Sequence, residues 1–316
     1  MRESKQHQRF GRAAIAVFLV AEFCSMLYAA DTDTPATASQ FAKEVTKEKQ
    51  KHKETVAPLA APVFRWDFSR AEVVHTYRFE QEVRSKTDMG SSFDGKSGRI
   101  EEEMSATGVL LIKSQGDSTA TLVLKDMKTS MKRNMGAAGP KTVEEQMPPI
   151  VVQGMKDDGT GSFGNSFQDP VLKMLFPLPT KPVMIGESVD IPAQMPFNVM
   201  GSILPVTGCL RITLTRYVKI GKHTCAQLDV DTDILKLKVP TELKGEYKCS
   251  LKGPSVFYFD VESRSFVSGA IAMLMQISID APMPQMKISG KDAPDMPERI
   301  KGSMTIDNPI RVKLKE

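Results

Sequence analysis

Three aspartates, Asp229, Asp231 and Asp233, occupy alternate positions of one predicted strand. Because successive side chains of a strand point to opposite faces, the three carboxylates project from one face at intervals of about 6–7 Å. Such a row holds Ca²⁺ when further oxygen ligands converge on the ion. The solvated face of an amphipathic strand has the same spacing without binding any ion. The aspartates are therefore a candidate metal site, with an exposed strand face as the alternative.

Methionine is unusually frequent, with 19 in the chain. Met283 and Met286 have the spacing of a thioether pair, and thioethers bind Cu(I). The strand predicted from Ala270 to Ile279 is apolar on both faces, so it is either buried between layers or lines a cavity. Methionine also packs adaptably in cores, which leaves copper binding, core packing and ligand binding open, and no cofactor is expected. The predicted ligand groove is lined by Ile271, Met273, Met275 and Ile277.

Three cysteines follow residue 30, namely Cys209, Cys225 and Cys249, and none belongs to a Cys-x-x-Cys motif. A zinc site is therefore not expected. In an oxidising compartment we expect one disulfide and one thiol. Cys225 and Cys249 lie on successive predicted strands around the turn at residues 239–241, which favours this pair. A Cys209–Cys225 bond stays open, because the strand register decides which Cα atoms are close enough.

Few residues of the sequence are candidates for a catalytic base or nucleophile. The histidines after residue 30 are His52, His75 and His223, and no Gly-x-Ser-x-Gly elbow accompanies them. The glycines of residues 159–164 do not lie between a strand and a helix, as a phosphate-binding loop would. Lysine and arginine total 42 against 38 acidic residues, so no strong basic field attracts nucleic acid. We predict a protein that is not an enzyme, with catalysis by carboxylates alone as the remaining alternative.

The first 30 residues set the expected compartment. A basic segment precedes the apolar run Ala13–Ala21, and small residues end the segment at positions 29 and 30, as in a secretory signal peptide. Glu22 disfavours an uncleaved membrane anchor, and Phe23 before Cys24 disfavours a lipidated cysteine. We therefore predict residues 1–30 as a signal peptide, no transmembrane span after its cleavage, and a periplasmic or extracellular location.

Residues 31–62 have a different composition from the rest of the chain. Residues 41–54 are mostly Lys, Glu, Gln and Thr, and residues 56–62 are rich in Ala and Pro. Such a segment buries too little apolar surface to offset the entropy lost on ordering. We predict a charged, largely disordered tether, with a helix that binds a partner as the alternative.

From residue 63 the apolar pattern has a period of two, which is typical of half-buried strands. Residues 77–83 alternate in this way, and turn signals follow at Ser114–Asp117 and Gly221–Lys222. One short helix is predicted at residues 169–175, where Asp and Pro provide a cap and a first helical residue.

Many short strands with little helix predict a mostly β domain over residues 63–316. The expected architecture is a curved antiparallel sheet, a half-barrel or open barrel with one or two short helices. Both parts of the domain show the same strand pattern, which suggests two similar halves at residues 63–180 and 181–316.

Two segments carry a resemblance to a known group of proteins. Residues 176–188, FPLPTKPVMIGES, look like the proline-and-glycine element of uncharacterised exported β-rich bacterial proteins. Residues 257–263, FYFDVES, resemble their aromatic-x-Phe-Asp hairpin. These proteins are loosely similar to the half-barrels of periplasmic lipoprotein carriers. The resemblance implies a role in the cell envelope or outside the cell, and it implies no catalytic residues.

These observations together favour an exported protein that binds a hydrophobic ligand, such as a lipid, or an envelope component. A structural or protein-interaction module of the envelope is the first alternative, with an envelope protein as its partner. A metal-binding protein is the second.

Overall fold

The computed structural model describes most of the predicted β domain and part of the predicted tether. The signal peptide, Met283 and Met286 lie outside the described residues, so the predictions for them stay predictions. The predicted helix at residues 169–175 also lies outside them, except for its last two residues. The described residues are 40–57, 62, 64–89, 98–134, 140–160, 174–199, 202–282 and 299–315.

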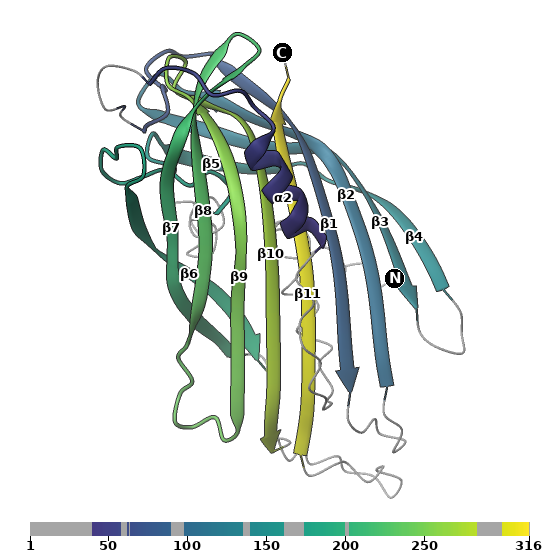
Figure 1. The fold of residues 1–316 in the computed structure, drawn as a ribbon. Coiled ribbons are helices and arrows are strands. Elements are labelled where there is room, and N and C mark those ends of the chain that lie inside the picture. The colour runs from purple at the N-terminus through teal and green to yellow at the C-terminus, as the bar shows by residue number, and fades with distance from the viewer. Residues whose placement is uncertain are drawn as a thin grey trace, which may run out of the picture.

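Eleven strands form one antiparallel sheet in the order β4-β3-β2-β1-β11-β10-β9-β8-β7-β6, and β5 pairs with β3 beside β4. The sheet is curved and does not close, because the described strands β4 and β5 at one edge do not pair with β6 at the other (Figure 1). The predicted mostly β, open curved sheet is thus confirmed. The strands are β1 (Val74–Met89), β2 (Gly98–Ser114), β3 (Thr119–Asn134), β4 (Pro140–Met147), β5 (Ile150–Lys156), β6 (Ser188–Val199), β7 (Ser202–Ile220), β8 (His223–Leu237), β9 (Glu246–Asp260), β10 (Ser265–Pro282) and β11 (Arg299–Leu314).

Local sequence explains where these strands begin and end. The turn predicted at Ser114–Asp117 joins β2 to β3, and Gly221 and Lys222 join β7 to β8. Gly116 and Gly221 have φ angles of 83° and 56°, in the left-handed region that glycine adopts without steric cost. The two predicted halves form adjoining sectors of the same sheet, which meet where β1 pairs with β11.

The two faces of the sheet bury different side chains. We call inner the face whose side chains form the larger buried cluster, and outer the face that carries the helix α2 (Gln40–Gln50). In β1, Tyr77, Phe79 and Val83 point inward, while Arg78 and Glu82 between them are exposed. This alternation follows from the two-residue repeat of a strand, and it explains why the polar half of each strand faces water.

Aromatic side chains fill one end of the inner face, near the β9–β10 turn. The Trp66 ring lies 5.4–5.6 Å from the rings of Phe68, Phe176 and Phe266, measured between centroids. The Tyr77 hydroxyl donates a hydrogen bond of 2.8 Å to the Phe266 carbonyl oxygen. Close ring packing adds to the stabilisation from burial, so this aromatic end is a tightly packed part of the core.

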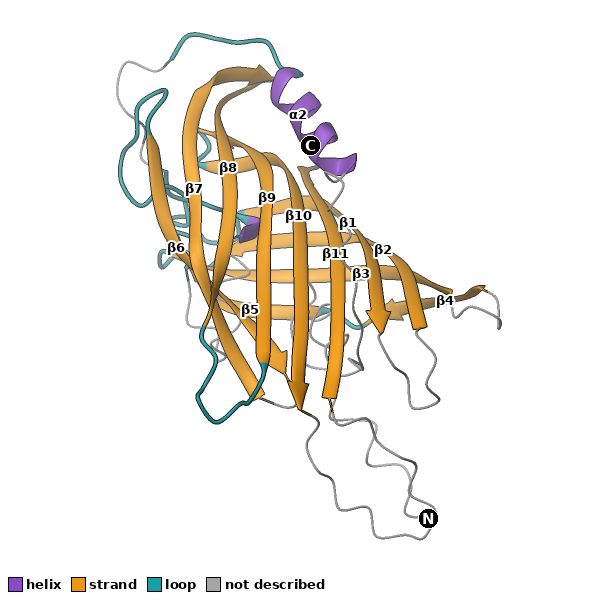
Figure 2. Ribbon diagram, turned by 60° about the horizontal axis from the view of Figure 1, so that its bottom comes forward, coloured by secondary structure: helices purple, strands orange, loops and turns teal. Residues whose placement is uncertain are grey.

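The tether prediction is wrong for residues 40–57. Helix α2 lies on the outer face of the curved sheet, against β9 and β10 (Figures 1 and 2). Phe41 and Val45 are 7% and 0% exposed and pack on a second apolar cluster. The mainly polar composition predicted a segment without a packed face. The spacing of four residues, however, places both side chains on one face of the helix. The cluster beneath them consists of Val218, Cys225, Val256, Tyr258, Val267, Ala270 and Ala272.

Polar contacts hold α2 and the residues after it in place. Arg216 donates a 2.6 Å hydrogen bond to the carbonyl oxygen of Lys49, and the Tyr258 hydroxyl donates one of 2.7 Å to that of Glu48. These two bonds satisfy carbonyl groups that the end of a helix leaves free. Beyond the helix, the Thr55 N–H donates to the Tyr217 carbonyl oxygen, so the chain runs along the end of β7. No helix among the described residues is long and apolar enough to span a membrane.

A carboxylate joins the ends of two hairpins. The Asp260 Oδ2 lies 2.7 Å from His223 Nδ1 and accepts a 2.6 Å hydrogen bond from Ser263. The Glu262 N–H donates to its Oδ1. Burial opposes ionisation of Asp260, but these donors outweigh it and hold the pKa of the carboxyl below its usual value.

We predict that Phe41→Ala lowers the free energy of unfolding by about 3 kcal/mol, because it removes a buried ring and leaves a cavity. Urea unfolding followed by circular dichroism measures this change. Lys47→Ala is the control, since Lys47 is exposed on the same helix. Equal stabilities of the two variants would show that α2 does not contribute to the fold.

We predict that Asp260→Asn lowers the free energy of unfolding by about 1–3 kcal/mol at pH 7, because it removes a buried charge-assisted hydrogen-bond acceptor. The folded-state pKa lies below the unfolded value of about 3.9. The stabilisation is therefore complete above that value and is lost as the pH falls through the folded pKa. Urea unfolding at pH 7 and pH 3.5 tests this, and a difference that stays constant between the two would contradict it.

Candidate functional site

The four residues of the predicted ligand groove lie together on the inner face of β10. Ile271, Met273, Met275 and Ile277 are between 2% and 6% exposed and belong to the larger buried cluster. The strand is apolar on both faces only beside α2, where Ala270 and Ala272 pack beneath the helix. Farther along, Gln276 on the outer face is exposed. The predicted groove thus corresponds to one face of the strand.

Neighbouring strands extend this apolar surface sideways. Met275 lies opposite Ile306 on β11 and Leu251 on β9, and Ile277 lies opposite Met304. Seven methionines among the described residues are buried in the larger cluster, and we call the methionine wall the five of them that lie on β2, β6, β10 and β11. They are Met104 on β2, Met195 on β6, Met273 and Met275 on β10, and Met304 on β11.

The methionine wall and the aromatic end occupy opposite parts of the inner face. The aromatic end lies where β10 begins, at Phe266, and the methionine wall lies toward the other end of the strand, where β8 joins β9. Ring stacks have few alternative packings, whereas an unbranched thioether chain adopts several at little cost. The described strands at the two sheet edges, β6 on one side and β4 and β5 on the other, share no hydrogen-bond ladder. Moving these edges apart therefore breaks no such ladder.

A strip of polar side chains crosses the inner face beside the methionine wall. Gln81 Nε2 donates a 2.9 Å hydrogen bond to Asn308 Oδ1 on the neighbouring β11. Ser85 and Thr87 follow on β1, and Glu102 on β2 lies opposite Ser85. We call these five residues the polar strip, and all are buried. The sequence analysis did not select these residues. Gln81 nevertheless stands at a position of β1 where the alternation would place an apolar residue.

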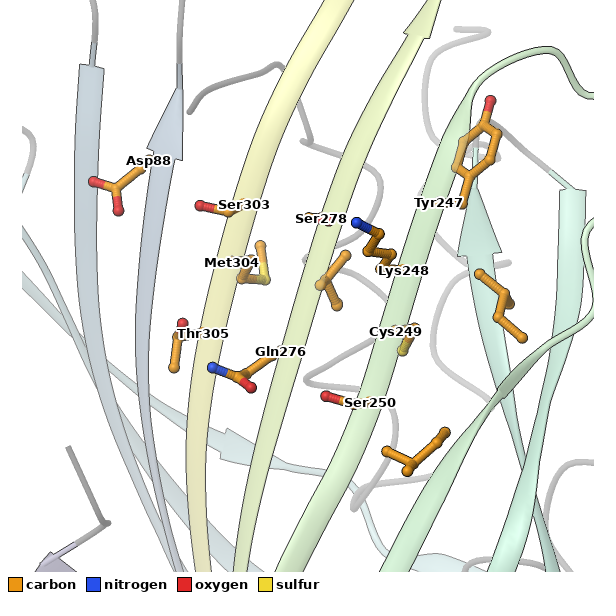
Figure 3. A pocket seen from close by; sticks show the side chains of 13 residues that line it. Asp88, Tyr247, Lys248, Cys249, Ser250, Gln276, Ser278, Ser303, Met304 and Thr305 are labelled. Carbon is orange, nitrogen blue, oxygen red and sulfur yellow. The ribbon is translucent and has the colours of Figure 1, made fainter. Parts of the chain in front are cut away.

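A separate pocket of about 560 Å³ lies over β9, β10 and β11 (Figure 3). Because side chains alternate along each strand, those of Ser250, Gln276, Ser278, Ser303 and Thr305 point to the outer face. Ile277 and Met304 also line the pocket, although both point inward with the larger buried cluster. The pocket is therefore a mainly polar feature of the outer face, which adjoins the methionine wall at Met304.

The aspartates of the candidate calcium site do not converge. All three lie on the outer face, where Asp231 and Asp233 are exposed and the half-buried Asp229 pairs with Lys49 of α2 at 3.1 Å. Asp233 lies 3.8 Å from Lys252. No group of three His, Cys, Asp or Glu side chains able to hold a metal occurs among the described residues. The structure thus assigns Asp229, Asp231 and Asp233 to an ordinary polar strand face.

The predicted Cys225–Cys249 disulfide is wrong. Cys225 lies opposite Asp260, whereas Cys249 lies 11 residues away on β9 opposite Ile277, a separation of roughly 36 Å along the strand. Both cysteines, and Cys209, are free thiols. Burial raises the pKa of the Cys225 thiol to about 12, so it stays protonated at neutral pH and is a core residue.

The histidines form no nucleophile–base pair with a serine or cysteine among the described contacts. Ser263 donates to Asp260 and not to His223, so the cluster lacks the order of a catalytic triad. The His75 ring packs at a tilt against Trp66 with the centroids 5.8 Å apart, and burial lowers the pKa of His75. His52 lies edge-on against Tyr258 at 4.9 Å. The prediction that the chain is not an enzyme stays a prediction.

No protein-family model and no curated protein matches the chain. Among solved structures, it is similar to a structure of lipid–protein interactions in lipovitellin, with 8% identity and a TM-score of 0.37 over 77% of this chain. The match spans 25% of the lipovitellin chain. A DUF1329 family protein from Desulfovibrio piger is 10% identical over 87% of this chain and 92% of its own, with a TM-score of 0.11. Scores this low carry no functional conclusion.

Proposed function

We propose that the protein binds a hydrophobic ligand against the methionine wall on the inner face of its open sheet. The observation that supports this most directly is the contiguous apolar surface around Met273 and Met275, which continues onto β9 and β11. Each CH₂ group of an alkyl chain moved there from water contributes about 0.8 kcal/mol. An apolar surface of this kind therefore supplies affinity without a charged recognition site.

The different packing of the aromatic end and of the methionine wall supports a route by which the ligand enters. The aromatic end holds the sheet in shape, while the side chains of the methionine wall repack around a ligand at little cost. The described edge strands β6, β4 and β5 are not joined to each other by hydrogen bonds. The ligand enters as these edges separate, and the strand pairs of the sheet stay intact.

The proposed location follows from the first 30 residues. A signal peptide there would deliver the protein to the periplasm or outside the cell. Hydrophobic molecules in either place need a carrier or a binding protein to stay in solution. The proposal is thus a non-enzymatic, exported protein that binds an apolar ligand.

A pair of opposite substitutions on neighbouring residues tests the proposal. Met275 points inward and Gln276 points outward. We predict that Met275→Gln weakens binding of the apolar dye N-phenyl-1-naphthylamine about tenfold or more, because the dye then contacts an amide. Gln276→Met should leave the affinity unchanged, although it adds a methionine to the protein. Fluorescence titration measures both.

Circular dichroism and urea unfolding must show that both variants are folded. Met275→Gln places an amide in the core at a cost of about 1–3 kcal/mol, which a domain with a large buried cluster tolerates. If the dye does not bind the wild type, or if it binds both variants equally, the ligand site on the inner face is wrong.

A further inference from the structure

The polar strip lies where an apolar core would be expected. Gln81, Ser85 and Asn308 are 1%, 4% and 6% exposed, and their neighbours on the inner face include Val83 and Ile306. The β1 and β11 backbones already pair with each other around these residues. The sheet therefore does not need these side chains for its hydrogen bonding.

Two of the strip's atoms, Gln81 Oε1 and Ser85 Oγ, have no hydrogen-bond partner among the described residues. A buried polar atom without a partner costs about 1–3 kcal/mol, and an apolar side chain at either position would avoid that cost. In native structures such atoms call for an explanation, and one explanation is a partner that is not part of the chain.

The position of the strip relates it to the methionine wall. Ser85 lies opposite Ile306, and Met304 lies opposite Thr87. The next inward-facing residues along β1 toward the aromatic end are Val83 and then Gln81. A ligand on the methionine wall thus has polar atoms at its side and apolar surface along its length.

We infer that the ligand is an uncharged amphiphile, an alkyl chain that carries a hydroxyl or amide group bonded to the polar strip. This inference rests on the proposed function and specifies its ligand class. A hydroxyl or amide both donates and accepts, so it satisfies either the Gln81 carbonyl oxygen, which needs a donor, or the Ser85 hydroxyl, which lies four residues farther along β1, roughly 13 Å along the strand. An ionised phosphate or carboxylate offers acceptors only and would carry a charge into a buried site.

Competition for the bound dye N-phenyl-1-naphthylamine tests the inference with ligands of one chain length. We expect 1-dodecanol to displace the dye at about tenfold lower concentration than dodecanoate or dodecyl phosphate. This preference should fall below about threefold in at least one of two variants, the double variant Gln81→Met/Asn308→Leu and Ser85→Ala. Gln276→Met on the outer face is the matched control and should keep the full preference.

Stability gives a second readout. Replacing both partners of a buried pair by apolar groups is nearly neutral, and removing an unpaired hydroxyl is neutral or stabilising. Both variants should therefore unfold at the same urea concentration as the wild type or a higher one. A clear loss of stability in Ser85→Ala would show that the hydroxyl has a structural partner, and it would overturn the inference.

The outcomes separate the inference from the proposed function. Dye binding with equal displacement by all three competitors, or a preference for an anionic one, overturns the uncharged amphiphile and leaves the apolar site standing. A wild-type protein that binds neither the dye nor any competitor overturns both.

Discussion

The pairing of β1 with β11 joins a strand near the beginning of the described chain to the last one, and the rest of the structure depends on it. This ladder runs from Tyr77 opposite Leu314 to Met89 opposite Gly302. It unites the two sectors of the sheet and fixes which side chains of both strands point inward. A shift of one residue would turn the inner residues of β1 to the outer face and separate Gln81 from Asn308.

Different side chains stabilise the aromatic end, the outer face beneath α2 and the methionine wall of this sheet. Close contacts between aromatic rings around Trp66 pack the aromatic end, and α2 covers an apolar part of the outer face. The methionine wall consists of side chains that repack easily. The described edge strands beside it share no ladder. We propose that binding takes place here because this is the part of the inner face that changes shape at the lowest cost.

Local patterns were sufficient to predict the curved open sheet, several turns and the alternation that places Met273 and Met275 on the same strand face, because a two-residue period is visible in the sequence. Local patterns were not sufficient where the strand register or the tertiary packing determines which residues come together. Cys225 and Cys249 lie on successive strands, yet the ladders place Cys225 of β8 opposite Asp260, 11 residues along β9 from Cys249. Phe41 and Val45 looked too few to order a polar segment, but the outer face supplies the rest of their apolar cluster. Asn308 became a site residue only through its pairing with Gln81.

The central claim is that an apolar ligand contacts the inner face of the sheet. Photolabelling tests it most directly, with a dodecanol that carries a diazirine in its alkyl chain and with mass spectrometry to locate the adducts. We predict saturable labelling at inner-face residues such as Met273, Met275 and Met304, which unlabelled dodecanol prevents. Labelling confined to outer-face residues such as Gln276 and Thr305, or labelling that dodecanol does not prevent, would contradict the account.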